Sequence, residues 1–377
     1  MQLPPSEILA ARHARLRQSL EALRLDALVV TAPANIRYLT NHAGTSGIAV
    51  LTSADVHLVI DFRYEEAVRA LQASASACPG LRTWPVPDSY EEALVTCLGE
   101  MGLPGVGFEA GHVSVARHAW WARTLAARSM GIDLRGTEHV VEQARMVKDA
   151  WELATLRDSA ARLTPVTAAL VAAIRPGMAE RQVAGLLEGL MREAGYDRLA
   201  FETIVASGPN AALPHHRAGD RTLAHGDLVV LDFGGVLDGY CCDLTRTVSI
   251  GPPSAEARRV YNAVRDAQQA AIDAVRPGIE ASAVDAAARG VLQARGLGEA
   301  FGHGTGHGLG LDVHEDPRVS RPRPETPPVT LVPGMVFTIE PGAYLAGWGG
   351  VRIEDDVLVT EEDCEVLTSA PRELVSL

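Results

Sequence analysis

The chain has 377 residues, of which 47% are hydrophobic and 21% are charged. This length exceeds one ordinary domain, and the composition is that of a folded globular protein rather than a disordered chain. There are 34 lysines and arginines against 47 aspartates and glutamates, which gives a net charge of −13. This acidic balance argues against nucleic acid or an anionic membrane surface as the main partner.

The cysteines and the N-terminus indicate a reducing compartment. The five cysteines do not form the dense, even set of a secreted disulfide framework, so we expect buried free thiols. The first residues lack the apolar core of a signal peptide, and no apolar run reaches the roughly 18–20 residues of a membrane span. These features predict a cytoplasmic protein.

The first part of the chain alternates helical and strand-like stretches. Hydrophobic spacing predicts a helix over 8–24, strands at Ala27–Val30, Gly47–Leu51 and Val56–Ile60, and a helix over Tyr64–Leu71. We therefore predict a small α/β domain over residues 1–135 and a second domain over residues 136–377. A charged helical stretch, Val147–Leu163, follows the predicted boundary.

The second domain contains an internal repeat. The string Ala173–Met178 returns 101 residues later as Ala274–Ile279, and each copy has a Pro-Gly turn, a helical stretch and a terminal glycine. Further on, Gly226–Gly234 matches Gly334–Gly342, since each has a glycine turn, a buried β-run, an acid, one residue and a glycine. The repeat predicts two related halves, built from helices and strands, that face each other.

Four acids occupy matched places in these halves. Asp232 follows an apolar run, where a carboxylate is costly to bury unless it is paired or binds a cation. Asp243 lies eleven residues later, across a hairpin turn predicted at Asp238–Gly239, so strand pairing would bring the two carboxylates together. Glu340 and Glu354 are the counterparts in the second half. Four carboxylates and two divalent cations would neutralise each other, which favours a dinuclear site over ordinary turn or ion-paired acids.

Histidines gather in a glycine-rich stretch. Residues 302–315 hold five glycines and three histidines, His303, His307 and His314. Glycines let backbone and ligands approach closely, but their spacing here does not complete a dinucleotide-binding fingerprint. In the first half, His215 and His216 precede Asp232 at a comparable position. We therefore expect functional histidines in both halves.

With these motifs the chain resembles a known family, the pita-bread metallopeptidases, which include methionine aminopeptidase, aminopeptidase P and prolidase. The family's five metal ligands are matched by Asp232, Asp243, His307, Glu340 and Glu354. Asn35–Thr40 and Asp61–Tyr64 are similar to the creatinase-like N-terminal domain of the proline-specific members, which methionine aminopeptidases lack. The implied fold is α/β (α+β), with a small creatinase-like N-terminal α/β domain followed by a pseudo-twofold pita-bread catalytic domain.

The resemblance implies two divalent metal ions per subunit, Mn²⁺ first and Co²⁺, Fe²⁺ or Zn²⁺ as alternatives. It implies that Asp243 chelates one ion, that Asp232 and Glu354 bridge the pair, and that His307 and Glu340 complete the other. A metal-bridging hydroxide would attack the scissile carbonyl, with Glu340 as proton carrier. The remaining catalytic positions implied by the resemblance are His215, His303, His314 and Arg352.

The implied reaction is hydrolysis of the Xaa-Pro peptide bond in short proline-containing peptides, by a homodimer that binds neither nucleic acid nor membrane. An Xaa-Pro dipeptidase is favoured over an Xaa-Pro aminopeptidase because the N-terminal domain is short. A non-catalytic scaffold and a creatinase-like metal-free hydrolase are the alternatives, and both should lack the metal-ligating acids. Arg352 shares a strand face with Glu354, so it either pairs with a site acid or reads a substrate carboxylate.

Overall fold

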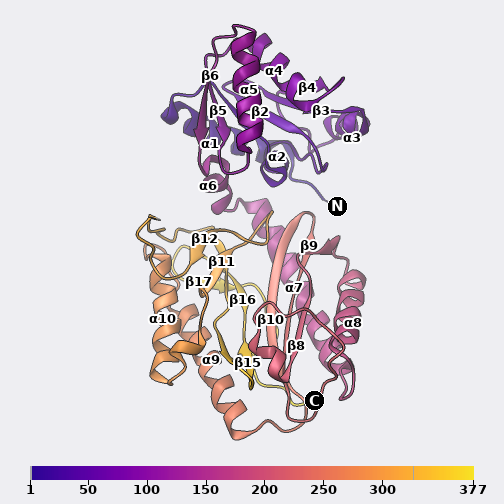
Figure 1. Ribbon diagram of the computed structural model, residues 1–377, viewed down its shortest axis with the longest axis vertical. Helices are drawn as coiled ribbons and strands as arrows, with labels where there is room; N and C mark the ends of the chain where they lie inside the picture. Colours follow the sequence, from indigo (N-terminus) through magenta and orange to yellow (C-terminus); the bar gives the residue numbers. More distant parts are fainter. Residues whose placement is uncertain (1, 326) are drawn as a thin grey trace. The chain divides into compact units, whose positions relative to one another are not determined.

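The structure is a computed structural model that describes residues 2–325 and 327–377 (Figure 1). The chain divides into two compact units, Gln2–Arg145 and Met146–Leu377. The division falls after Arg145, whereas the sequence analysis placed the boundary near residue 135. The reason is a long-range contact, since the Arg145 guanidinium donates to the Asn35 side-chain oxygen at 2.6 Å and ties the last helix to the first unit.

The first unit is a six-stranded sheet with helices, in the strand order β4-β3-β2-β1-β5-β6. Its elements are α1 (Ser6–Leu23), β1 (Ala27–Val30), α2 (Pro33–Thr40), β2 (Ile48–Thr52), β3 (Val56–Ile60), α3 (Phe62–Gln72), β4 (Leu81–Pro85), α4 (Tyr90–Met101), β5 (Gly105–Glu109), α5 (Val115–Ala127), β6 (Asp133–Thr137) and α6 (Val140–Met146). Strand β2 is antiparallel to both neighbours, and the other pairs are parallel. The predicted helices and strands of this region are confirmed.

A buried acid fixes the start of α2 in this unit. Glu109, at the end of β5, accepts hydrogen bonds from the backbone N–H groups of Thr31 and Ala32 at 2.6 and 2.8 Å. Its other oxygen accepts from the Asn35 amide at 2.6 Å. The carboxylate thereby satisfies donors at the helix N-terminus that would otherwise have no partner.

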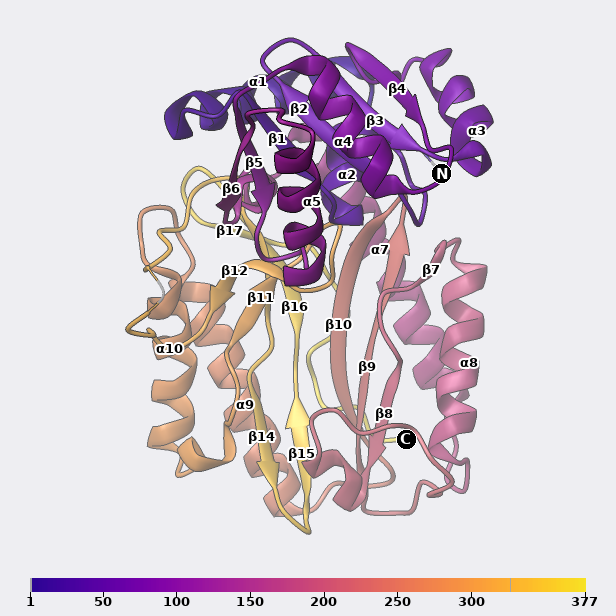
Figure 2. The same ribbon diagram turned by 45° about the horizontal axis from the view of Figure 1, so that its top comes forward.

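The second unit consists of two halves, each with a pair of helices beside its strands (Figures 1 and 2). The first half contains α7 (Ala150–Ala173), α8 (Glu180–Glu193), β7 (Arg198–Leu199), β8 (Ile204–Ser207), β9 (Leu228–Leu237) and β10 (Tyr240–Ser249). The second contains α9 (Ala255–Ala274), α10 (Ala281–Ala294), β11 (Gly306–Gly308), β12 (Glu315–Val319), β13 (Val336–Ile339), β14 (Gly342–Leu345), β15 (Gly349–Arg352), β16 (Asp355–Val359) and β17 (Cys364–Val366). Each half has its own hydrophobic core cluster.

The helices repeat at the spacing found in the sequence. α7 and α9 end at Ala173 and Ala274, and α8 and α10 have 14 residues each. The turns between them contain Gly177 and Gly278, whose φ angles of 86° and 88° favour glycine. α7 differs from the predicted helix over Val147–Leu163, because its buried apolar side chains continue beyond the proline inside it.

The remaining expectations of the sequence analysis concern the thiols and the membrane. All five cysteines are free, four of them buried and Cys364 partly exposed, as expected. Among the helices of residues 2–325 and 327–377, none has the length and apolar character needed to cross a membrane.

Candidate metal centre and active site

A pocket of about 360 Å³ in the second unit gathers the predicted residues of both halves. Its lining includes all five predicted metal ligands, Asp232, Asp243, His307, Glu340 and Glu354. It also includes the four other predicted catalytic residues, His215, His303, His314 and Arg352. The structure therefore brings together every residue that the sequence analysis assigned to the site.

The first half contributes its acids from one long hairpin. Strands β9 and β10 pair without interruption from Tyr240–Leu237 to Ser249–Leu228, around a turn at Asp238 and Gly239. Both turn residues have positive φ, 51° and 90°, as the predicted hairpin turn requires. Asp232 lies opposite Thr245, two residues from Asp243, so both carboxylates lie on one face of the hairpin.

The second half contributes its acids from strand ends. Glu340 directly follows β13, and Glu354 directly precedes β16, with Ile339 paired to Asp355 between the two strands. Thr245 joins the halves here: its carbonyl accepts from the Glu354 backbone N–H at 3.1 Å, and its hydroxyl donates to the Glu354 carboxylate at 2.5 Å. The hairpin of the first half thus orients a carboxylate of the second.

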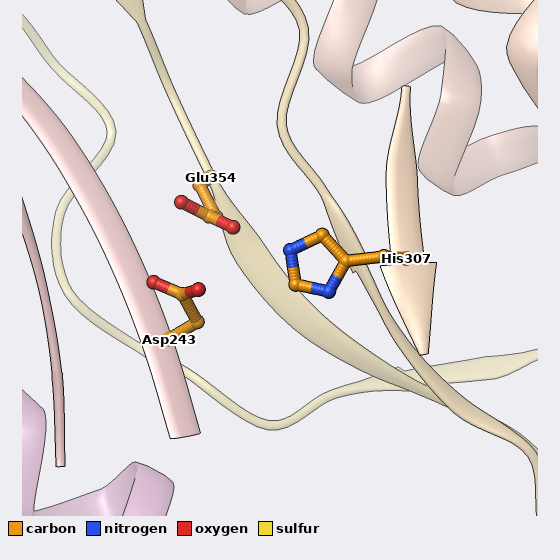
Figure 3. Close-up of side chains that lie close together, drawn as sticks. All are labelled: Asp243, His307 and Glu354. Carbon is orange, nitrogen blue, oxygen red and sulfur yellow. The ribbon is translucent and has the colours of Figure 1, made fainter. Parts of the chain in front are cut away.

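Three side chains converge closely enough to share one metal ion. Asp243 on β10, His307 on β11 and Glu354 before β16 each offer a ligand atom, and these atoms lie within 4.8 Å of one another (Figure 3). The His307 Nδ1–H donates to the Gly308 carbonyl at 3.1 Å, which leaves the Nε2 lone pair for a metal. The Glu340 carboxylate lies 3.7 Å from this nitrogen.

The hydrogen bonding of the acids also fits a bound cation. One oxygen each of Asp232, Asp243 and Glu354 is buried without a hydrogen-bond partner among the described residues. A bare, buried carboxylate oxygen is unfavourable, and a cation would relieve it. Carboxylate oxygens with one imidazole suit a divalent ion of intermediate hardness, so the residues present fit the expected metals.

Burial and mutual repulsion perturb the protonation of these groups. Burial, followed by the charges of Glu354 and Asp232, raises the pKa of Asp243 well above its usual range. Burial and the charge of Asp232 raise the pKa of Glu354 to about 8. Burial and Glu354 likewise raise the pKa of Glu340. Burial lowers the pKa of His307 to about 4, so its imidazole is neutral, as a metal ligand must be.

The adjacent histidines of the first half separate cleanly. His215 lines the pocket, whereas the His216 ring donates to the buried carboxylate of Glu180 at 2.8 Å. Of the two, His215 was predicted by the family resemblance, and it is the one that lines the pocket. The two histidines lie in a turn, not in a strand, so their divergence comes from the anchor on Glu180.

The histidines of the second half are held in defined states. His303 donates from Nδ1 to the Gly304 carbonyl at 2.8 Å, so its Nε2 accepts from the Tyr344 hydroxyl at 2.9 Å. Burial lowers the pKa of His303 to about 4, and burial also lowers the pKa of His314. The His314 ring lies 4.3 Å from that of His307, measured between centroids.

The guanidinium of Arg352 forms hydrogen bonds with side chains of the protein. Its guanidinium donates to the Asp232 carboxylate at 2.5 Å, to the Tyr344 hydroxyl at 2.9 Å and to the Thr245 hydroxyl at 3.2 Å. The side chain is only 4% exposed. Of the two tasks that the sequence analysis left open, the structure therefore favours pairing with a site acid.

Arg318, Ser320 and Arg323 line the pocket and were not predicted from the sequence. Neither were three residues that hydrogen-bond to predicted site residues, Thr245, Tyr344 and Asp356. Thr245 and Asp356 each lie two residues beyond a predicted ligand, and Asp356 accepts a hydrogen bond from the Asp243 backbone at 3.0 Å. Tyr344 lies diagonally across the β14–β15 hairpin from Arg352. Strand alternation, which places residues i and i+2 on one face, is the signal that could have found them.

Known proteins share this architecture over the whole chain. Residues 12–147 match the creatinase/prolidase N-terminal domain, and residues 154–361 match metallopeptidase family M24. The chain is 38% identical over 377 residues to the probable dipeptidase PepE of Mycobacterium tuberculosis, covering 98% of this chain and 97% of the relative. The Xaa-Pro dipeptidase from Bacillus anthracis has a TM-score of 0.90 at 33% identity, covering 98% and 100% of the two chains. The X-Pro aminopeptidase from Thermotoga maritima has a TM-score of 0.85 at 34% identity, covering 97% and 99%.

Proposed function

The chain belongs to metallopeptidase family M24, and we propose that it hydrolyses the peptide bond before proline, with Xaa-Pro dipeptides as its preferred substrates. The observation that supports this proposal is one pocket lined by the five predicted metal ligands together with histidines and arginines. A non-catalytic scaffold or a metal-free hydrolase would not need buried carboxylates with bare oxygens.

Two divalent cations, with Mn²⁺ favoured, would supply Lewis acidity and lower the pKa of a water molecule. The side chains that would hold them are Asp232, Asp243, His307, Glu340 and Glu354. Arg352 neutralises part of the negative charge through Asp232 without competing for a metal, since a guanidinium stays protonated.

The chain's own side chains would perform the remaining steps. Glu340, whose pKa is raised by burial, is suited to accept a proton from the attacking water and pass it to the leaving proline nitrogen. His215 and His314 line the pocket and can donate to the oxyanion that develops on the scissile carbonyl. The proline nitrogen carries no hydrogen, so recognition of this bond relies on the pocket and not on an amide donor.

Two further arginines support the preference for dipeptides. Arg318 and Arg323 line the same pocket, together with Ser320. The guanidinium of Arg352 already serves Asp232 and Tyr344, so we assign the carboxylate of a dipeptide to this second pair. The carboxylate of a tripeptide lies one residue further from the scissile bond, so it would not occupy the same position beside Arg318 and Arg323.

The test is an assay of Ala-Pro, Ala-Pro-Ala and Ala-Ala with Mn²⁺ and after exhaustive chelation. We expect Mn²⁺-dependent turnover of Ala-Pro, weaker turnover of Ala-Pro-Ala and none of Ala-Ala. Faster turnover of the tripeptide would make the chain an aminopeptidase, and full activity after chelation would exclude the metal-dependent reaction. Absence of turnover on all three peptides with metal bound would favour the scaffold alternative.

A matched pair of variants tests the arginine assignment. Arg318→Ala should reduce kcat/KM for Ala-Pro about 10- to 150-fold, the range expected for a lost charge-assisted contact, and affect Ala-Pro-Ala much less. Arg295→Ala, a change at an exposed arginine of the same unit, is the control. Equal losses on both peptides would contradict a role in reading the carboxylate.

A further inference from the structure

Three of the pocket histidines are not predicted metal ligands, and two of them, His215 and His303, are presented by loops with the same kind of anchor. Each loop is fastened to a helix of its own half by a buried carboxylate. Glu180 begins α8 and has 0% exposure, and Asp285 lies on α10 with 1% exposure. Neither acid lines the pocket of the metal ligands.

Glu180 holds both ends of the loop that carries His215. One of its oxygens accepts from the backbone N–H and the hydroxyl of Ser207 at 2.8 and 2.6 Å. The other accepts from the His216 ring at 2.8 Å and from the Gly219 backbone at 3.2 Å. The Asn210 amide also donates to this carboxylate, at 3.0 Å. The acid therefore fixes residues before and after His215.

Asp285 performs the corresponding task for the loop that carries His303. It accepts from the backbone N–H and the hydroxyl of Thr305 at 3.0 and 2.8 Å. It also pairs with Arg289 at 2.6 Å, and Arg289 donates to the carbonyl of Phe301 at 3.1 Å and to that of His303. Asp285 and Arg289 together thus hydrogen-bond to three alternate residues of this loop, Phe301, His303 and Thr305.

The two anchors lie at different positions of the repeat. The offset of 101 residues pairs Glu180 with Ala281, and Asp285 with Ala184. Each half therefore uses a different residue of its second helix for the same purpose.

We propose that Glu180 and the Asp285–Arg289 pair are positioning residues for hydrolysis, which act through His215 and His303 respectively. This inference rests on the proposed function, because it assigns a task to loops beside that active site. The buried charges accept several donors at once, so a shortened or neutral side chain would release the loop and displace its imidazole. Displacement of a catalytic group by about 1 Å can lower a rate on the order of 100-fold.

A pair of double-mutant cycles tests the proposal on the Mn²⁺-loaded full chain. Glu180→Gln and Asp285→Asn should each lower kcat for Ala-Pro roughly 10- to 100-fold, with metal content unchanged. In a His215→Ala background, Glu180→Gln should lower kcat little further than His215→Ala alone, because Glu180 acts through the imidazole that is already missing. The same should hold for Asp285→Asn in a His303→Ala background, whereas the crossed pairs should be additive.

The controls separate positioning from a general structural role. Glu193→Gln changes an exposed acid of α8 and should leave kcat unchanged. Additive losses within either matched pair would overturn the proposal for that half, as would losses that follow metal content or thermal stability. If a Gln or Asn variant does not fold, His216→Ala and Thr305→Val each remove one side-chain donor to the same carboxylates and replace it in the cycle. If the unmodified protein hydrolyses another peptide and not Ala-Pro, the proposed function is wrong. The double-mutant cycles are then measured with that peptide as the substrate.

Discussion

Buried carboxylates occur in both units, and Glu109 of the first unit differs in its hydrogen bonding from the predicted metal ligands of the second. In the first unit, Glu109 meets Thr31, Ala32 and Asn35, and both of its oxygens have partners. In the second unit, Asp243 and Glu354 each keep one buried oxygen without a partner among the described residues. Burial alone therefore does not distinguish a structural acid such as Glu109 from a predicted metal ligand. The bare oxygens gather at the site, where Asp356, next to the predicted ligands, also has one.

The difference implies opposite contributions to stability when no metal is bound. A carboxylate that accepts several buried donors stabilises the fold, and its loss leaves those donors unpaired. Clustered carboxylates with bare oxygens repel each other and are poorly solvated, so they destabilise the metal-free fold. The site acids thus lower the stability of the metal-free protein, whereas a bound cation would make them stabilise the fold.

The largest expected effect comes from removing a central ligand. Asp243→Ala should lose at least one metal ion and lower activity on the order of 10³-fold or more, since metal stabilisation is worth several kcal/mol. Elemental analysis and the Ala-Pro assay measure both outcomes. The metal-free variant should remain at least as stable as the metal-free parent, because one repelling charge is gone. Full metal content in this variant would contradict the ligand assignment.

The next largest expected loss of activity comes from removing Arg352, which pairs with one of the site acids. Arg352→Ala should lower kcat/KM about 10- to 150-fold on Ala-Pro and Ala-Pro-Ala alike, and it should weaken metal binding through Asp232. Titration with Mn²⁺ and the two peptide assays are the measurements. A loss confined to the dipeptide would instead make Arg352 the reader of the substrate carboxylate.

Matched substitutions in the two units test the comparison directly. Glu109→Gln should destabilise the protein by about 1–3 kcal/mol, because a Gln amide cannot accept on both sides. Glu354→Gln should stabilise the metal-free protein, since it removes a buried charge beside Asp232 and can still accept from Thr245. Denaturant unfolding in the presence of a chelator compares them. Destabilisation by both substitutions would mean that the site acids are satisfied without metal.

The smallest effect is a pH dependence. The pKa of Glu354 is raised to about 8, above its usual value of 4.5. The folded metal-free protein therefore holds this proton more tightly than the unfolded chain, so the stabilisation is complete below pH 4.5 and is lost as pH rises through about 8. Thermal unfolding with a chelator should show a steeper fall in Tm from pH 5 to 8 for the parent than for Glu354→Gln. Parallel profiles would contradict the raised pKa.

The sequence was sufficient where the structure is local or repeated. The β9–β10 hairpin and the duplicated helices follow from turn residues and hydrophobic spacing within short segments. The ligand set needed the resemblance to a family as well as the repeat. The strings that carry that resemblance are residues 231–234, 243–247, 302–315, 339–342 and 351–355.

Long-range contacts were beyond the reach of these patterns. Asn35 accepts from Arg145 across 110 residues, which moved the unit boundary. The anchor between His216 and Glu180 spans 36 residues. No hydrophobic period predicts such pairs, because a polar side chain selects its partner from whatever the folded core brings near.

The continuous pairing of β9 and β10 restricts which changes in chain length the protein can tolerate. Side chains in a strand alternate between the two faces, so loss or gain of one residue between Asp232 and the turn would direct that carboxylate to the opposite face. A change of two residues would preserve the face but shift the acid along the strand. Single-residue insertions or deletions between Asp232 and Asp243 should therefore be absent from active relatives.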